Sequence, residues 1–206
     1  MEVTLLKEYQ FGDMLCQYYL DSNTKNVELM LLPGGTKPVD WKRKNQAVDS
    51  LVQVKIAGDT YLGGYAGGGT MRQGESVTKL KYKDQQLLCQ EDRELVITYL
   101  SDERGYEAEH HLTWYRTSKS VETFTKFVNQ SKETIDLEMI SSFSLGGITP
   151  FTPGDAYDTL NIHRLRSVWS MEGRLETKTI EELQLEPSWA GHAVRSERFG
   201  QVGSMA

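Results

Sequence analysis

The chain has 206 residues, 38% of them hydrophobic and 25% charged, which is enough apolar material for one large folded domain. The formal net charge of -6 and the isoelectric point near 5.3 argue against nucleic-acid and anionic-membrane partners, because both select for clustered Lys and Arg. No apolar run approaches the roughly 20 residues of a membrane span, and residues 1–10 do not resemble a signal peptide, so we expect a cytoplasmic protein with no membrane partner.

Short runs that alternate apolar and polar residues, or that are rich in β-branched residues, follow one another along the chain. Gly, Asn, Asp, Lys and Ser separate them, and this pattern is typical of β-strands. The runs predicted as strands cover residues 27–32, 51–56, 80–88, 95–100, 108–115, 121–129, 135–143 and 160–169. Their number and spacing predict an all-β sandwich.

Helix signals are weak. Thr179 and Glu182 have the spacing of a capping box, but Leu183 and Leu185 alternate as in a strand, and we favour a strand there. Trp114 and Trp169 lie inside predicted strands and are expected in the core. In the strand around residues 107–116, one parity is suited to the core and holds Ala108, His110, Leu112 and Trp114.

A glycine-rich segment covers residues 58–74 and is the least ordinary part of the sequence. Glycines at this density permit a close backbone approach and positive φ angles, so the segment is either a binding loop or a long connection between sheets. It contains no GxxxxGK[ST] motif, and Arg72 stands where the third glycine of a dinucleotide fingerprint would fall. We therefore expect no nucleotide cofactor.

Catalytic and metal-binding motifs are also missing from the sequence. There is no GxSxG elbow and no HExxH spacing, and the four histidines form no ligand cluster, so neither a metal nor another cofactor is expected. Cys16 and Cys89 are far apart and fit reduced, buried thiols. The sequence thus predicts no catalytic residue in this chain.

Aromatic residues in polar or glycine-rich segments are the best candidates for ligand contact. Trp41, Tyr61 and Tyr65 lie in such segments, and rings of this kind stack on the apolar faces of sugars. Burial in the core is the equally weighted alternative. The three residues remain candidates for a sugar platform.

Two long runs near the end of the chain resemble a known family. Residues 163–174 read HRLRSVWSMEGR, and residues 195–205 read RSERFGQVGSM. Both are similar to the end of the N-terminal domain of bacterial family 36 glycoside hydrolases of the α-galactosidase type. Residues 49–53, DSLVQ, and residues 70–72, TMR, are similar to an earlier part of the same domain.

The resemblance implies a large twisted antiparallel β-sandwich, called a supersandwich, that covers residues 1–206 as a single domain and stops before a (β/α)8 catalytic barrel. The family's retaining reaction on α-galactosides such as melibiose or raffinose uses two carboxylates about 5 Å apart, and both are barrel aspartates. The nucleophile run Lys-Trp-Asp is absent here, since Asp40-Trp41-Lys42 has the reverse order. By itself this chain is expected to be inactive.

The resemblance also implies partners. They are the chain's own barrel and the neighbouring subunits of an oligomer, where a loop of this domain reaches the sugar pocket. By position, Trp41, Asp49 and Arg72 are the candidates for that rim; pairing of Arg72 with a surface carboxylate is the alternative. Two further hypotheses remain open for the whole chain: an autonomous carbohydrate-binding module and a purely structural scaffold.

Overall fold

The computed structural model describes residues 3–37, 48–60, 74–152, 158–167, 169–170 and 172–183. The described residues up to Ile148 form one compact unit, and those from Thr149 onward form a second. Their strands are antiparallel, with one short helix, and the predicted all-β sandwich is confirmed in the first unit. Within these ranges, no helix is long and apolar enough to cross a membrane. That residues 1–206 form a single domain stays a prediction.

A three-stranded sheet begins the first unit. It contains β1 (Val3–Phe11), β2 (Met14–Asp21) and β3 (Val27–Pro33) in the order β1-β2-β3. The turn from β1 to β2 needs a glycine, because Gly12 has a φ of +59° and a Cβ there would lie 2.8 Å from the Trp114 ring. The sequence analysis did not predict β1 or β2.

The second sheet has four strands in sequence order, joined by short turns. They are β5 (Lys81–Cys89), β6 (Arg93–Ser101), β7 (Tyr106–Tyr115) and β8 (Ser120–Asn129). All four were predicted, with ends that differ by one or two residues. The predicted parity of β7 is confirmed, since Ala108, His110 and Leu112 are fully buried and Trp114 is 6% exposed.

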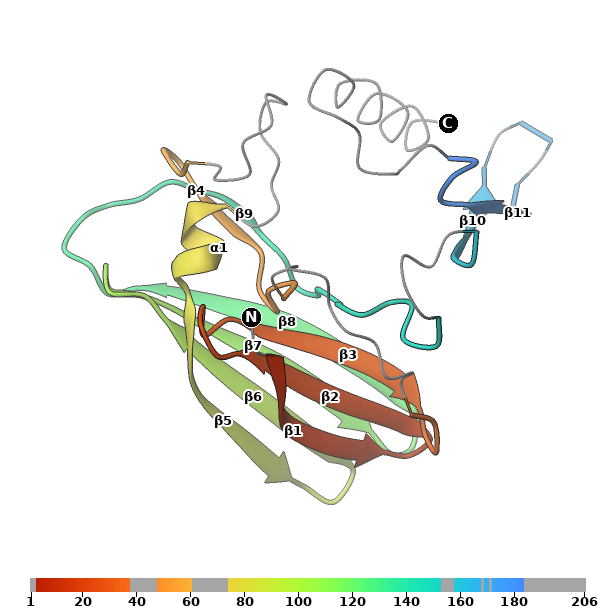
Figure 1. Cartoon of the computed structure of the whole chain (residues 1–206), viewed down its shortest axis with the longest axis horizontal. Coiled ribbons are helices and arrows are strands. Elements are labelled where there is room, and N and C mark those ends of the chain that lie inside the picture. Colours follow the sequence, from red (N-terminus) through yellow and green to blue (C-terminus); the bar gives the residue numbers. More distant parts are fainter. Residues whose placement is uncertain are drawn as a thin grey trace. The chain divides into compact units, whose positions relative to one another are not determined.

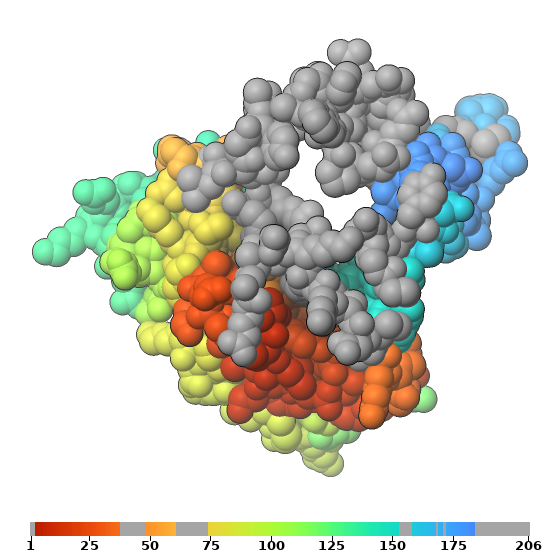
Figure 2. Space-filling view, in the orientation of Figure 1, coloured from red at the N-terminus to blue at the C-terminus, as the bar shows by residue number. Residues whose placement is uncertain are grey.

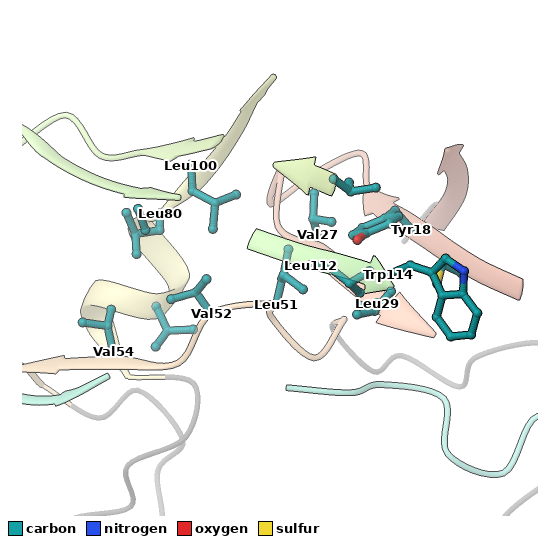
Figure 3. Close-up of a cluster of buried hydrophobic side chains, with 14 of the residues drawn as sticks. Tyr18, Val27, Leu29, Leu51, Val52, Val54, Leu80, Leu100, Leu112 and Trp114 are labelled. Atoms are coloured by element: carbon teal, nitrogen blue, oxygen red, sulfur yellow. The ribbon is translucent and has the colours of Figure 1, made fainter. Parts of the chain in front are cut away.

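The two sheets share one hydrophobic core. Figure 1 shows β1 to β3 lying across β5 to β8, and Figure 2 shows the outside of the first sheet in red and orange beside the yellow region of α1. The core includes Tyr18, Val27, Leu29, Leu51, Val52, Val54, Leu80, Val96, Leu100, Leu112 and Trp114, most of which are drawn in Figure 3. Each fully buried aliphatic side chain of this kind contributes about 1.5–3 kcal/mol.

Strand β3 is buried on both of its faces. Val27 and Leu29 face the core, while Glu28 and Met30 on the other face are each 1% exposed. Gly146 and Gly147 lie against this outer face: a Cβ on Gly146 would be 2.1 Å from Glu28 Cδ, and one on Gly147 would be 2.2 Å from Met30 Cε. Side chains at these two positions would therefore collide with β3.

Three short elements complete the first unit. Strand β4 (Val54–Ile56) pairs with β9 (Leu137–Ile140), and helix α1 (Glu75–Lys79) precedes β5. The predicted strands 51–56 and 135–143 are both longer than the strands observed. Residues 51–53 are buried but do not belong to a strand. Their backbone hydrogen bonds are single ones, to Val27 on β3 and to Ser141 after β9, and they form no continuous ladder.

The second unit contains a hairpin of β10 (Asn161–Arg166) and β11 (Arg174–Thr179). The prediction that Trp169 is a core residue is wrong: the strand ends at Arg166, and Trp169 lies in the turn with 94% of its surface exposed. The prediction of a strand after Thr179 is also wrong for the described residues 180–183. Thr179 and Glu182 instead form the capping box, with reciprocal backbone bonds of 2.9 and 3.1 Å.

The two thiols differ in their surroundings. Cys16 is fully buried in the core as predicted, and burial raises the pKa of its thiol to about 12. The prediction of burial is wrong for Cys89, which is exposed at the end of β5, an edge strand of its sheet. Both thiols are free, as expected.

Candidate functional site

The predicted rim residues belong to two segments of the sequence or lie next to them, and the structure describes the residues that flank these segments. Asp49 is described, whereas Trp41, Tyr61, Tyr65 and Arg72 lie outside the described residues. Asp49 follows the segment 38–47, and the segment 61–73 begins after Thr60 and ends before Gly74. The sandwich holds the residues that flank these two segments by hydrogen bonds.

The Asp49 backbone is fixed to β3. Its N–H donates to Glu28 Oε2 over 2.6 Å, and two residues later the Leu51 N–H donates to the Val27 carbonyl over 2.7 Å. Val48 on one side and Leu51 on the other are at most 1% exposed. A hydrogen bond to a buried carboxylate is stronger than one between two neutral groups. The backbone of Asp49 is therefore held firmly on β3.

The segment after Asp49 is fastened from its other side by the residue that follows β9. The Gln53 N–H donates to Ser141 Oγ over 2.9 Å, and the Ser141 N–H donates to the Gln53 carbonyl over 2.8 Å. Gln53 Nε2 also donates to the Ser50 carbonyl over 3.0 Å. Residues 48–53 thus lie between β3 and the chain after β9, with little freedom to shift.

The glycine-rich segment is closed at its base by Thr60 and Glu75. The Glu75 N–H donates to the Thr60 carbonyl over 3.0 Å, while the Thr60 N–H and Oγ1 both donate to Glu75 Oε2, over 3.2 and 2.8 Å. Hydrogen bonds from Lys79 and then from Thr60 lower the pKa of Glu75 to about 2. The carboxylate therefore stays ionised at ordinary pH, and the base of the segment stays closed.

A second layer ties this base to the β6–β7 turn. Ser76 Oγ donates to Asp59 Oδ1 over 2.8 Å and accepts from Arg104 Nη2 over 3.0 Å. Arg104 also donates to Asp102 through Nε and Nη2, over 2.9 and 2.7 Å, and lies 4.8 Å from the centre of the Tyr106 ring. These bonds to Asp102 raise the pKa of Arg104. The sequence did not predict this group, because its members are scattered between Asp59 and Tyr106.

The family-like run 163–174 includes part of β10 and the first residue of β11, and two of its arginines pair with Glu176 within the hairpin. Arg164 Nε contacts Glu176 Oε2, and Arg166 Nη2 lies 3.1 Å from Glu176 Oε1. The two guanidinium groups, Arg164 first, lower the pKa of Glu176. On the other face, Leu165 and Leu175 are directly opposite each other, with 71% and 61% exposure. Arg164 and Arg166 therefore stabilise the hairpin by pairing with Glu176.

Among the described residues, no cluster of three or more His, Cys, Asp and Glu side chains could hold a metal ion.

Comparison with known proteins gave no match. No family model matches the chain, and neither a curated protein nor a solved structure is significantly similar to it.

Proposed function

We propose that the chain is the non-catalytic N-terminal β-sandwich domain of an α-galactosidase-type family 36 glycoside hydrolase. In this role it packs on the catalytic barrel, supports oligomerisation and shapes the rim of the galactoside pocket. Two observations support the proposal: the runs at residues 163–174 and 195–205, and the all-β sandwich that residues 3–37, 48–60 and 74–148 form. The chain's own contribution is binding and positioning, and hydrolysis belongs to the barrel.

The observation that carries the proposal is a run of exposed apolar side chains in the first unit. We call Leu137, Ile140, Phe143 and Ile148 the docking strip; their exposed fractions are 43%, 37%, 43% and 58%. They lie on β9 and on the chain that follows it, within 12 residues of one another. Concentration of large apolar groups on one segment is typical of a surface that another protein covers.

The position of the docking strip favours a partner that also contacts the proposed rim near Asp49. Ser141, between Ile140 and Phe143, is the residue that fastens Gln53 and thereby the Asp49 segment. A barrel that packs on the docking strip would therefore lie near the segment 48–53, which contains the proposed rim residue Asp49. The two hydrogen bonds, of 2.8 and 2.9 Å, join Ser141 to Gln53, four residues after Asp49.

An isolated domain with such a strip should self-associate. We expect the chain to form concentration-dependent dimers in sedimentation velocity, because apolar surface left in water associates with itself. The double substitution of Ile140 and Phe143 by Ser should weaken this association at least about tenfold, which corresponds to a loss of roughly 1.4 kcal/mol of association free energy.

Leu88 provides the matched control. It is 43% exposed on β5, outside the docking strip, so Leu88→Ser removes a similar apolar group from another part of the first unit. This variant should associate like the wild type. Equal weakening by both variants, or a wild-type chain that stays monomeric at all concentrations, would count against the docking strip.

A further inference from the structure

The outer face of the four-stranded sheet carries an aromatic ring that the scaffold does not use. Phe124 lies on β8, at the edge of the order β5-β6-β7-β8, and 45% of its surface is exposed. Its neighbours in sequence, Thr123 and Thr125, have the opposite parity and belong to the inner face. Phe124 therefore contributes little to the core.

The ring is nevertheless held in one orientation. The imidazole of His111, directly opposite on β7, stacks on it with ring centroids 4.3 Å apart and an interplanar angle of 12°. His111 is in turn opposite Ile97 on β6, which is 8% exposed. Because one face of the Phe124 ring is covered by the imidazole, the exposed area belongs to its other face and its edges.

Two charged residues flank the ring on the same strand. Glu122 and Lys126 lie two positions before and after Phe124, so all three side chains share one face of β8. Each is oriented by β7: Tyr115 OH donates to Glu122 Oε2 over 3.1 Å, and Lys126 Nζ donates to Glu109 Oε1 over 2.9 Å. The bond from Lys126 is also the first cause of the lowered pKa of Glu109.

We infer that Phe124, Glu122 and Lys126 form a binding site for a neutral pyranoside sugar. A pyranose ring has an apolar C–H face, which stacks on an aromatic ring, and a rim of hydroxyls that both donate and accept hydrogen bonds. Glu122 provides an acceptor and Lys126 a donor on opposite sides of that ring. Glu109, which accepts from Lys126, adds a second carboxylate beside the single ammonium, so the site does not favour an anionic ligand. Because the groups are already oriented, little ordering is needed on binding.

This inference does not depend on the proposed role beside a barrel, since every residue in it lies on β7 or β8. It also differs from the sugar platform predicted from the sequence, which consists of Trp41, Tyr61 and Tyr65. We expect dissociation constants of about 1–10 mM, as for a ligand held by one ring and two hydrogen bonds.

The test is a titration of the ¹⁵N-labelled chain with methyl α-D-galactopyranoside and, separately, methyl α-D-glucopyranoside, followed by amide chemical shifts. We expect saturable shifts centred on residues 122–126 and 109–111. Phe124→Ala should weaken binding at least about tenfold, and Lys126→Met about threefold. The matched control is Phe151→Ala, which removes another exposed phenyl group, 48% exposed, from outside the site and should bind like the wild type.

Three results would overturn the inference. The first is the lack of saturable shifts with either sugar up to about 50 mM, well above the expected dissociation constants. The second is a set of shifts centred elsewhere in the chain. The third is a set of shifts at Phe124 that follow protein concentration and not sugar, because the ring would then contact a second copy of the chain. The wild-type shifts decide the matter even if Phe124→Ala does not fold.

Discussion

Acidification from pH 7 to pH 4 is expected to remove about 3 kcal/mol from the free energy of unfolding through His110 alone. His110 lies on the inner face of β7 with no exposed surface, and neither ring nitrogen has a hydrogen-bond partner among the described residues. Its cross-strand neighbours there are Thr98 on β6 and Thr125 on β8, which are uncharged. Burial first, and then the nearby His111, lower the pKa of His110 to about 4.

The sign follows from proton binding in the two states. In the unfolded chain the pKa of His110 returns to its ordinary value of 6.5, so between about pH 6.5 and pH 4 the unfolded state binds more protons than the folded state. The stabilisation that depends on His110 being neutral is fully present above pH 6.5. It is lost progressively as the pH falls toward 4, the pKa of the folded state.

Denaturant unfolding at a series of pH values measures this effect. In His110→Leu, the free energy of unfolding that is lost between pH 6.5 and pH 4 should be smaller than in the wild type by about 3 kcal/mol. His163→Gln serves as the control, because His163 is exposed on β10, and should keep the wild-type slope. Identical pH profiles for His110→Leu and the wild type would show that the buried imidazole is not the cause.

Gly146→Ala is expected to destabilise the first unit by about 3 kcal/mol or more. The added Cβ would lie 2.1 Å from Cδ and 2.3 Å from Cγ of Glu28, so either the backbone at residue 146 or the Glu28 side chain must move. Neither moves freely: Glu28 is 1% exposed and accepts the Asp49 N–H, and the Gly146 N–H donates to the Leu29 carbonyl over 2.9 Å. The substitution should therefore disturb the anchor of the proposed rim as well as the packing.

Urea unfolding checks this expectation. Gly74→Ala is the matched control, since Gly74 has extended backbone with a φ of -68° and nothing within 4 Å of an added Cβ, and it should change the free energy by less than about 1 kcal/mol. Glu28→Ala combined with Gly146→Ala should cost less than the sum of the single changes, because the smaller side chain leaves room for the Cβ. Additive costs would mean that the two residues do not compete for space.

The sequence predicted β7 and β8 well because these two strands alternate in the way that one buried face requires. In β7, for example, His110 and Leu112 alternate with His111 and Thr113, and the register follows from that parity. Strands β1 and β2 were missed because Leu5-Leu6 in β1 and Tyr18-Tyr19 in β2 break the alternation. Their pairing with β3 decides their structure, and pairing is not visible in a local pattern.

The candidate site was predicted less completely, for physical reasons. Asp49 was named by position, but its anchor Glu28 was not, because a Glu inside a strand ordinarily faces solvent. The signal that was present is the pair Gly146-Gly147, which marks a close backbone approach. Trp169 was misplaced because the run from residue 160 was taken as one strand, although Gly173, with a φ of +72°, belongs to a hairpin turn.

The most direct test of the proposed function is calorimetric titration of this chain with the separately produced catalytic barrel of a family 36 α-galactosidase. The account predicts saturable binding with a negative heat-capacity change, as expected for buried apolar surface. It also predicts that the double replacement of Ile140 and Phe143 with Ser weakens binding at least about tenfold, whereas Leu88→Ser leaves it unchanged. Absence of heat at every temperature, or binding that both variants reduce equally, would contradict the assignment of this chain as a domain that docks on such a barrel.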